Sequence, residues 1–217
     1  MTRSEENYLK AIYHLGKTDK KAVATNAISE QMDTKPSSVT DMLKRLSEKG
    51  MVNYRKYQGV QLTEKGRSIA LSIIRKHRLW EVFLVEKLGF SWDEVHEVAE
   101  QLEHVHSEKL IDELDRHLGY PTVDPHGDPI PTKTGEIKKS IKKPLSDLEI
   151  GHQGICVGVK DSSPAFLKFL DKYGITLGHV IRVIDVEEFD GSFHIQIEDR
   201  QMHISDQIAN NLYIEIN

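Results

Sequence analysis

The sequence predicts an α+β protein built from three segments that differ in periodicity and charge. Apolar residues recur at helical spacing up to about residue 73 and end in two short alternating runs. A helical, acidic segment extends from there to about residue 131. After a polar stretch, residues 151–217 contain short strand-like runs separated by glycine turns, which is typical of a small barrel.

The net charge of −5 conceals an uneven distribution along the chain. Residues 1–76 hold 15 Lys/Arg against 8 Asp/Glu, whereas residues 77–150 hold 9 against 16. A basic first third on an acidic protein indicates a polyanionic partner. The acidic middle also carries six of the eleven histidines, and carboxylates together with imidazoles favour a bound cation.

The low cysteine count and the hydropathy pattern bear on localisation. The single cysteine excludes an internal disulfide and suits a reducing compartment. No apolar run approaches the roughly 20 residues needed to span a bilayer. We therefore expect a cytoplasmic protein without a membrane partner.

The first segment predicts helices followed by a hairpin. Ser4–Leu15 has the spacing of a short amphipathic helix, and Val23–Lys49 contains two helical patterns that break near Pro36. Met51–Thr63 alternates around Gln58-Gly59, which predicts a β-hairpin. This order is that of a winged helix-turn-helix, whose recognition helix, here about Ser37–Lys49, enters the major groove.

The predicted recognition helix and hairpin carry side chains that suit double-stranded DNA. Short polar groups near the start of the helix can meet bases or phosphates, and lysines and arginines suit phosphate oxygens. The candidate DNA-contacting residues are Lys35, Ser37, Ser38, Thr40, Asp41, Lys44, Arg45, Arg55 and Lys56. The alternative is a helical domain with a solvated basic face.

The second segment gathers acids and histidines. Thr63 can cap a long helix through Leu88 that carries His77 and Glu81 four residues apart. The stretch HEVAEQLEHVHSE places four polar side chains within about a quarter-turn of one helix: His96, Glu100, Glu103 and His104. Such a face is either simply solvated or a source of metal ligands.

A proline-rich loop and a lysine-rich stretch follow. The loop YPTVDPHGDPIP presents Asp124 and His126 between prolines, so that a carboxylate and an imidazole sit on a stiffened backbone. Residues Thr132–Lys143 contain five lysines and few apolar residues, which predicts a linker. Beyond it, the strand-like runs are Ile155–Lys160, His179–Val186, Phe193–Glu198 and Leu212–Ile216.

Five motifs, in this order, resemble the diphtheria-toxin-repressor family of metal-dependent transcriptional regulators over nearly the full chain. They are PSSVTDMLKRL, KGMVNY, RKHRLWEVFL, HEVAEQLEHV and DPHGDPIP, followed by the small C-terminal barrel. The resemblance implies a winged helix-turn-helix domain at 1–73, a helical metal-binding and dimerisation domain at 74–131, a linker at 132–150 and an SH3-like, FeoA-like barrel at 151–217. It also implies a homodimer that uses Mn²⁺ or Fe²⁺ as corepressor and binds a palindromic operator.

The resemblance further implies two metal sites. The first consists of Glu81, Asp124, His126 and Asp161, with His77 and His96 as additional or supporting ligands. The second consists of Glu100, Glu103, His104 and Asn7. Some relatives have Met or Asp where Asn7 stands, and manganese-type relatives have Glu where Lys10 stands. We therefore expect the second site to be weaker, or the protein to be mononuclear.

The donor set bears on the choice of metal. Oxygen and imidazole donors without a thiolate fit Mn²⁺ or Fe²⁺ better than structural Zn²⁺, although Zn²⁺ can occupy such a site in vitro. No nucleophile motif or phosphate-binding glycine loop indicates an enzyme. The main alternative is a metal-independent winged-helix transcription factor that senses another ligand.

Overall fold

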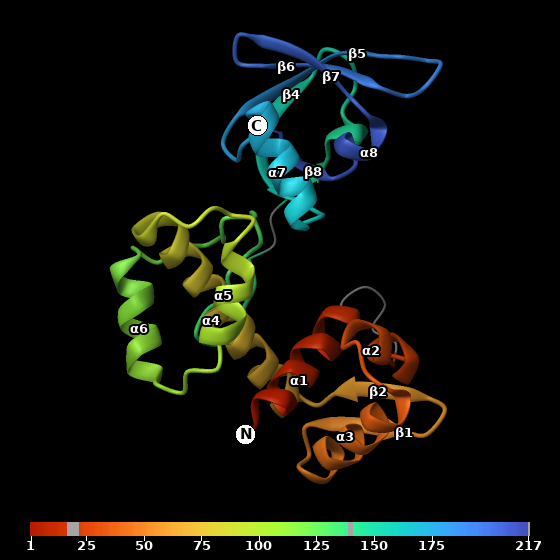
Figure 1. Ribbon diagram of the computed structural model, residues 1–217, viewed down its shortest axis with the longest axis vertical. Coiled ribbons are helices and arrows are strands. Elements are labelled where there is room, and N and C mark those ends of the chain that lie inside the picture. Colours follow the sequence, from red (N-terminus) through yellow and green to blue (C-terminus); the bar gives the residue numbers. More distant parts are fainter. Residues whose placement is uncertain (17–21, 139–140, 217) are drawn as a thin grey trace.

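The computed structural model describes residues 1–16, 22–138 and 141–216. Three units follow one another along its longest axis (Figure 1): helices with a hairpin at one end, a helical unit in the middle and a sheet at the other end. One long helix, α4, runs from the first unit into the second. The predicted α+β architecture is confirmed, with one correction to the last unit.

The N-terminal unit has the element order of a winged helix-turn-helix. Its elements are α1 (Arg3–Gly16), α2 (Thr25–Gln31), α3 (Pro36–Glu48), β1 (Val52–Arg55) and β2 (Gly59–Leu62). Pro36 occupies the first position of α3, where its fixed φ and missing N–H cost nothing. Leu9, Val39 and Leu43 are fully or almost fully buried in the shared core. The periodicity of the sequence therefore placed these helices correctly.

The middle unit is built on α4 (Glu64–Leu88), α5 (Val95–Leu102) and α6 (Glu108–His117). Thr63 caps α4 by accepting a hydrogen bond from Gly66 N at 3.1 Å. The first half of α4 packs into the N-terminal core through Ala70 and Ile74, and its second half packs against α6 through Leu79. A helix of this length spans about 37 Å, so α4 is a rigid connection between the two units.

The C-terminal unit is a six-stranded antiparallel sheet in the order β3-β8-β4-β5-β6-β7. Its elements are β3 (Lys143–Pro144), η1 (Leu145–Asp147), β4 (Gln153–Val159), α7 (Pro164–Tyr173), β5 (Val180–Val186), β6 (Phe193–Ile197), β7 (Arg200–Ile204), α8 (Asp206–Ala209) and β8 (Leu212–Glu215). The four predicted strand runs are confirmed as β4, β5, β6 and β8. Helix α7 covers the apolar core through Leu167 and Leu170.

The expected small SH3-like barrel has its predicted strands, but its sheet is open rather than closed. Among the described residues, the edge strands β3 and β7 do not pair with each other. Strand β3 has only two residues, and one of them, Pro144, has no N–H to donate to a further strand. In the same described ranges, no helix combines the length and apolarity that crossing a membrane requires.

Candidate metal centre

Two groups of acids and histidines lie where α1, α4, α5 and the proline-rich loop meet. We call Glu81, Asp124 and His126 the loop cluster, and Glu100, Glu103 and His104 the helix cluster. A cavity of about 440 Å³ is lined by the whole loop cluster and by Glu100 of the helix cluster, and residues of the sheet unit, including Lys160 and Ser162, also line it. All three units of the fold therefore meet around this cavity.

The loop cluster has the spacing of a metal site. Its three residues are each at most 6% exposed, and each offers a ligand atom within 4.8 Å of the other two. His126 Nδ1 lies 3.8 Å from Glu81 Oε1 and 3.9 Å from Asp124 Oδ1. Metal–ligand bonds of about 2.1 Å place neighbouring ligand atoms about 3–4 Å apart, so one cation fits between these atoms.

Hydrogen bonds with the backbone and contacts with Arg78 orient the side chains of the loop cluster. His126 Nε2 lies 2.9 Å from the carbonyl oxygen of Trp92, a contact that makes Nε2 the protonated nitrogen and leaves the Nδ1 lone pair facing the acids. Asp124 Oδ1 accepts backbone hydrogen bonds from His126 at 2.8 Å and Asp128 at 3.0 Å. Arg78 Nε lies 3.3 Å from Asp124 Oδ2, and Arg78 also binds Asp128. The loop is therefore shaped before a ligand binds.

The loop cluster carries negative charge in a buried place. Burial, followed by the negative charge of Glu81, raises the pKa of Asp124 to about 6. Burial would also raise the pKa of Glu81, but hydrogen bonds from His77 and His96 outweigh it and hold that pKa well below its usual value. Because one carboxylate resists ionisation beside another, an added divalent cation would be strongly stabilised here.

His77 bridges the two clusters. Its Nδ1 lies 2.7 Å from Glu103 Oε2, and its Nε2 lies 3.0 Å from Glu81 Oε1 and 3.2 Å from His96 Nδ1. Burial opposes the charged imidazolium, but the hydrogen bonds to Glu103 and Glu81 outweigh burial and raise the pKa of His77 to about 9. In this arrangement His77 carries a proton that a metal would have to displace. His77, His96 and Glu100 also form a second trio with metal-like spacing.

The helix cluster is oriented by a residue of α1. His104 Nδ1 lies 2.5 Å from Glu6 Oε2, so its other nitrogen faces Glu103 Oε1 at 3.7 Å. This carboxylate–histidine pairing is the usual way in which proteins aim a histidine at a metal. In the helix cluster, one lysine contacts two of the three side chains. Lys10 Nζ lies 2.5 Å from Glu100 Oε1 and 2.7 Å from Glu103 Oε2.

Of two further predicted ligands, Asn7 has a buried side-chain oxygen and Asp161 is exposed. Asn7 Oδ1 is buried and has no hydrogen-bond partner among the described residues. Asp161 is exposed, and its Oδ1 accepts a hydrogen bond from Ser163 N at the start of α7. Although its neighbours line the cavity, the structure does not bring Asp161 into either cluster.

The predicted DNA-contacting residues lie on one helix and one hairpin of the N-terminal unit. All except Thr40 are exposed, and Thr40 is partly exposed and donates a hydrogen bond to Pro36 O. Lys44 lies 3.6 Å from Asp41 on α3. Lys56 lies over the ring of Tyr57, which is 93% exposed at the hairpin turn. The hairpin therefore presents both a cation and an aromatic ring to solvent.

Three residues that shape the site were not predicted from the sequence: Glu6, Lys10 as a cation within the helix cluster, and Arg78. Glu6 is only 2% exposed. Its position in the first turn before the apolar residues Tyr8 and Leu9 is the one signal that could have placed it inside. Partners of Glu6 and Lys10 lie 90 to 98 positions away, so no local pattern identifies them.

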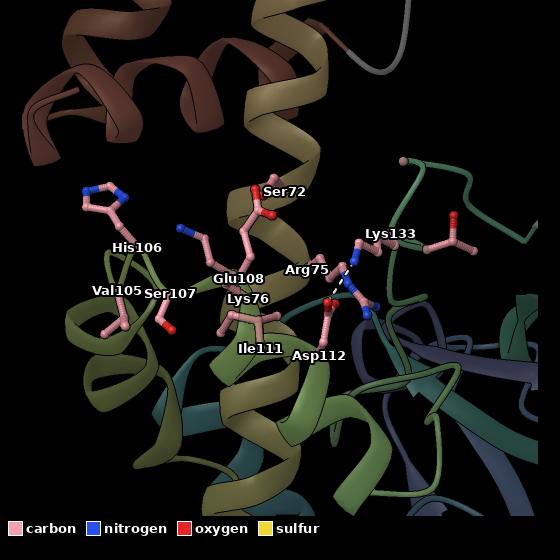
Figure 2. Close-up of a pocket in the computed structure, with 12 residues that line it drawn as sticks. Ser72, Arg75, Lys76, Val105, His106, Ser107, Glu108, Ile111, Asp112 and Lys133 are labelled. Atoms are coloured by element: carbon pink, nitrogen blue, oxygen red, sulfur yellow. Dashed lines mark hydrogen bonds and ion pairs between the residues drawn. The ribbon is translucent and has the colours of Figure 1, made fainter.

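A separate cavity of about 260 Å³ lies between α4, the start of α6 and the segment after Pro131 (Figure 2). Lys133 and Asp112 form an ion pair of 2.7 Å at one side of it. Lys76, adjacent to His77 in α4, also lines this cavity and is 9% exposed. It makes no hydrogen bond or ion pair within the described ranges, although the charges of Glu6 and Glu103 act on it.

Three family models match successive parts of the chain. Residues 1–60 match the iron-dependent repressor N-terminal DNA-binding domain, and residues 63–132 match the iron-dependent repressor metal-binding and dimerisation domain. Residues 143–216 match the FeoA domain. These matches correspond to the three units of the fold.

Curated relatives agree with the family models. The iron-dependent repressor IdeR of Mycobacterium tuberculosis is 39% identical over 129 residues, which are 58% of this chain and 54% of IdeR. The chain thus spans about half the length of that relative. The HTH-type transcriptional regulator MntR of Oceanobacillus iheyensis is 33% identical over 142 residues, which are 65% of this chain and 91% of MntR.

Solved structures resemble the whole chain. A manganese-dependent transcriptional repressor in complex with manganese superposes with a TM-score of 0.85 at 32% identity, covering 98% of this chain and 100% of that one. ScaR with bound Cd²⁺ gives a TM-score of 0.77 at 31% identity, covering 98% and 99%. On the strength of its domain order, its relatives and these structures, the chain belongs to the iron- and manganese-dependent repressor family.

Proposed function

We propose that this protein is a metal-dependent transcriptional repressor of metal-ion homeostasis. It would use Mn²⁺ or Fe²⁺ as corepressor and bind a palindromic operator as a homodimer in the cytoplasm. The observation that carries the proposal is the loop cluster, a buried set of two carboxylates and one imidazole shaped by outside hydrogen bonds. The relatives described as iron- or manganese-dependent repressors support the same assignment.

Glu81, Asp124 and His126 would hold the metal, with His77 and His96 beside them. The bound ion supplies positive charge that offsets buried carboxylates of α4 and the loop. The loop is itself joined to the sheet unit, because Val159 N donates to His126 O at 3.0 Å and Lys142 Nζ donates to Gly127 O at 3.0 Å. Occupancy of the cluster would therefore hold α4, the loop and β4 in one arrangement.

Helix α4 would carry this constraint to the DNA-binding unit. Its first half is part of the N-terminal core through Ala70, Leu71 and Ile74. Two recognition helices of a dimer must be held about 34–36 Å apart, or at a multiple of that distance, to enter successive major grooves. Fixing α4 in both subunits favours one spacing of the two α3 helices, which is a population shift rather than a new contact with DNA.

Binding without catalysis is the simplest activity for this arrangement. The loop cluster meets a DNA-binding unit, and the polar groups around it serve to orient its ligands. The competing function is a metal-independent winged-helix regulator, in which the acids and histidines would only stabilise the fold. The orientation of His126 by Trp92 O favours the metal-dependent function, because a purely structural histidine has no need of a free Nδ1 facing two carboxylates.

The first experiment measures DNA affinity with and without metal. A duplex is selected from a random pool in the presence of Mn²⁺ and labelled, and its anisotropy is titrated with protein at fixed salt. The titration is made after chelation and then with Mn²⁺, anaerobic Fe²⁺ or Zn²⁺, with a scrambled duplex as control. We expect at least tenfold tighter binding with Mn²⁺ or Fe²⁺, about 1.4 kcal/mol. Equal affinity after chelation would instead identify a metal-independent regulator.

A further inference from the structure

We propose that the Lys10 ammonium is the resident cation of the helix cluster, so that each subunit binds one divalent metal ion, at the loop cluster. This inference concerns the same site as the proposed function and rests on it for the loop cluster. It makes a separate statement, however, about how many ions the subunit takes up.

The position of Lys10 carries the inference. Its Nζ lies 2.5 Å from Glu100 Oε1, 2.8 Å from Glu103 Oε1 and 2.7 Å from Glu103 Oε2. The side chain of Lys10 is 13% exposed and that of Glu103 is fully buried. An ammonium has three N–H donors, and here three carboxylate oxygens face it. The nitrogen therefore occupies the point between the two acids where a metal would share them.

The other acids of this region are also paired. Glu6 contacts His104 and lies 3.7 Å from His106, and Glu103 also contacts His77. Each carboxylate of the helix cluster therefore has a basic partner within the chain: Lys10 for Glu100, and Lys10 together with His77 for Glu103. In the loop cluster, by contrast, no lysine contacts Glu81 or Asp124 within the described ranges, and Arg78 lies 3.3 Å from Asp124.

Lys10 also connects α1 to α5, as a metal ion bound by the helix cluster would. It joins α1 to the carboxylates of α5 and of the residue following α5. In its first turn α1 is also joined to the end of the recognition helix, because Lys49 Nζ lies 2.5 Å from Glu5 Oε1. The attachment of α1 to α5 is then permanent, and the metal-dependent step is confined to the loop cluster and the sheet unit.

The remaining donors of the helix cluster would form a metal site if Lys10 were removed. Glu100, Glu103 and His104 supply two carboxylates and an imidazole, and the buried Asn7 Oδ1 has no donor in the described structure. Replacing the ammonium by an uncharged side chain leaves these oxygens without their cation. The Lys10→Met variant should therefore gain one metal site per subunit.

Lys76 provides a matched control. It is a buried lysine of α4 within the electrostatic reach of Glu6 and Glu103, yet it forms an ion pair with neither. Lys76→Met removes the same charge from the same neighbourhood without uncovering a ligand. Lys10→Gln is a second variant that removes the positive charge, and it guards against a packing defect caused by methionine. Lys10→Arg is the conservative control, because it keeps a positive charge at this position.

The experiment is equilibrium dialysis of the full chain against Mn²⁺, with free Mn²⁺ measured by electron paramagnetic resonance and folding checked by circular dichroism. We expect one ion per subunit for wild type, Lys76→Met and Lys10→Arg, and two for Lys10→Met and Lys10→Gln. Two ions in wild type, or no gain on removing Lys10, would overturn the inference while leaving the proposed function intact. A wild type that binds none and a Lys10→Met variant that binds one would support the role of Lys10 and refute the metal site at the loop cluster.

Discussion

The loop cluster and the helix cluster use the same side-chain chemistry but differ in how their negative charge is balanced. In the helix cluster the balance is internal, since Lys10 and His77 both contact Glu103. In the loop cluster Arg78 contacts Asp124 at 3.3 Å, yet the pKa of that acid is still raised to about 6. A cation that belongs to the chain stabilises a permanent contact. Where the negative charge of the carboxylates is only partly neutralised, the site can respond to an added ion.

The largest expected effect is the loss of operator affinity when a ligand of the loop cluster, rather than one of the helix cluster, is removed. Glu81→Ala should remove the metal-dependent gain in operator affinity, a loss of about 1,000-fold or 4 kcal/mol, because it deletes a ligand of the loop cluster. Glu100→Ala should cost less, since Lys10 still contacts Glu103. Anisotropy titration at saturating Mn²⁺ measures both, with the exposed Glu86→Ala on the same helix as control. Equal or reversed losses would contradict this ranking of the clusters.

The second prediction concerns the stability of the metal-free loop cluster. The pKa of Asp124 is higher in the folded protein than its ordinary value of 3.8, so the folded state binds the proton more tightly and loses stability as pH rises from about 4 past about 6. Above that range the cost is of the order of 3 kcal/mol. Asp124→Asn cannot ionise and should stabilise the metal-free protein by about this amount at pH 7.5, with little effect at pH 4.

Urea denaturation in chelator at the two pH values measures the difference. Asp128→Asn is the control, because Asp128 also contacts Arg78 but its side chain is 49% exposed. The same Asp124→Asn protein should lose Mn²⁺ affinity despite its greater stability. A variant destabilised at pH 7.5 would show that the ionised Asp124 is already satisfied by Arg78 and the backbone.

The third prediction tests whether the sheet unit supports the loop cluster. Gly127 has φ +81°, and a Cβ there would lie 1.9 Å from Val157 O. Gly127→Ala should therefore separate the loop from β4, lower the free energy of unfolding by about 2 kcal/mol and weaken Mn²⁺ binding. Gly119→Ala is a close control, since Gly119 has φ +75° and no atom within 4 Å of its added Cβ. Unchanged Mn²⁺ affinity in Gly127→Ala would show that the loop holds its shape alone.

The smallest expected effect concerns Asn7. In a Lys10→Met background, Asn7→Asp should tighten Mn²⁺ binding at the helix cluster about tenfold, or 1.4 kcal/mol, because it adds a charged oxygen donor. In wild type the same change should have little effect on Mn²⁺ binding, because Lys10 retains the carboxylates. Calorimetric titration compares the two backgrounds, and Asn7→Ala shows the result of removing the oxygen. A tenfold gain in both backgrounds would indicate that Lys10 does not compete with the metal.

Elements of the fold that depend on contacts between residues close in the sequence were predicted, and features that depend on distant segments were not. The helical spacing around Ile69 and Ile73 located α4, and the alternating runs located four strands of the sheet. Helix α6 and strand β7 were not predicted individually. Apolar residues do recur at helical spacing in α6, where Ile111 and Leu114 are buried, whereas β7 reads RQMHI at the edge of the sheet. The openness of the sheet was not predicted, because closure of a barrel depends on edge pairing, which local alternation does not encode.

The candidate site divides in the same way. The prolines around Asp124 and His126, and the spacing of Glu100 and His104, identified the ligand types without any coordinates. The resemblance also suggested Asp161, whose carboxylate lies exposed at the start of α7. Glu6, Arg78 and the ion pairs of Lys10 came only from the folded chain. Periodicity tells which face of a helix is buried, but it does not tell which other element covers that face.

The sequence by itself determined the three-part architecture, the basic DNA-facing unit and the oxygen-and-imidazole chemistry of the middle unit, because these follow from composition and from contacts a few residues apart. Only the tertiary structure decided how charge is distributed between the two clusters. Lys10 meets Glu100 and Glu103 across 90 and 93 positions, and Asp124 becomes hard to ionise only when the loop folds against Glu81. Both effects depend on burial and distance, which exist only once distant segments have packed together.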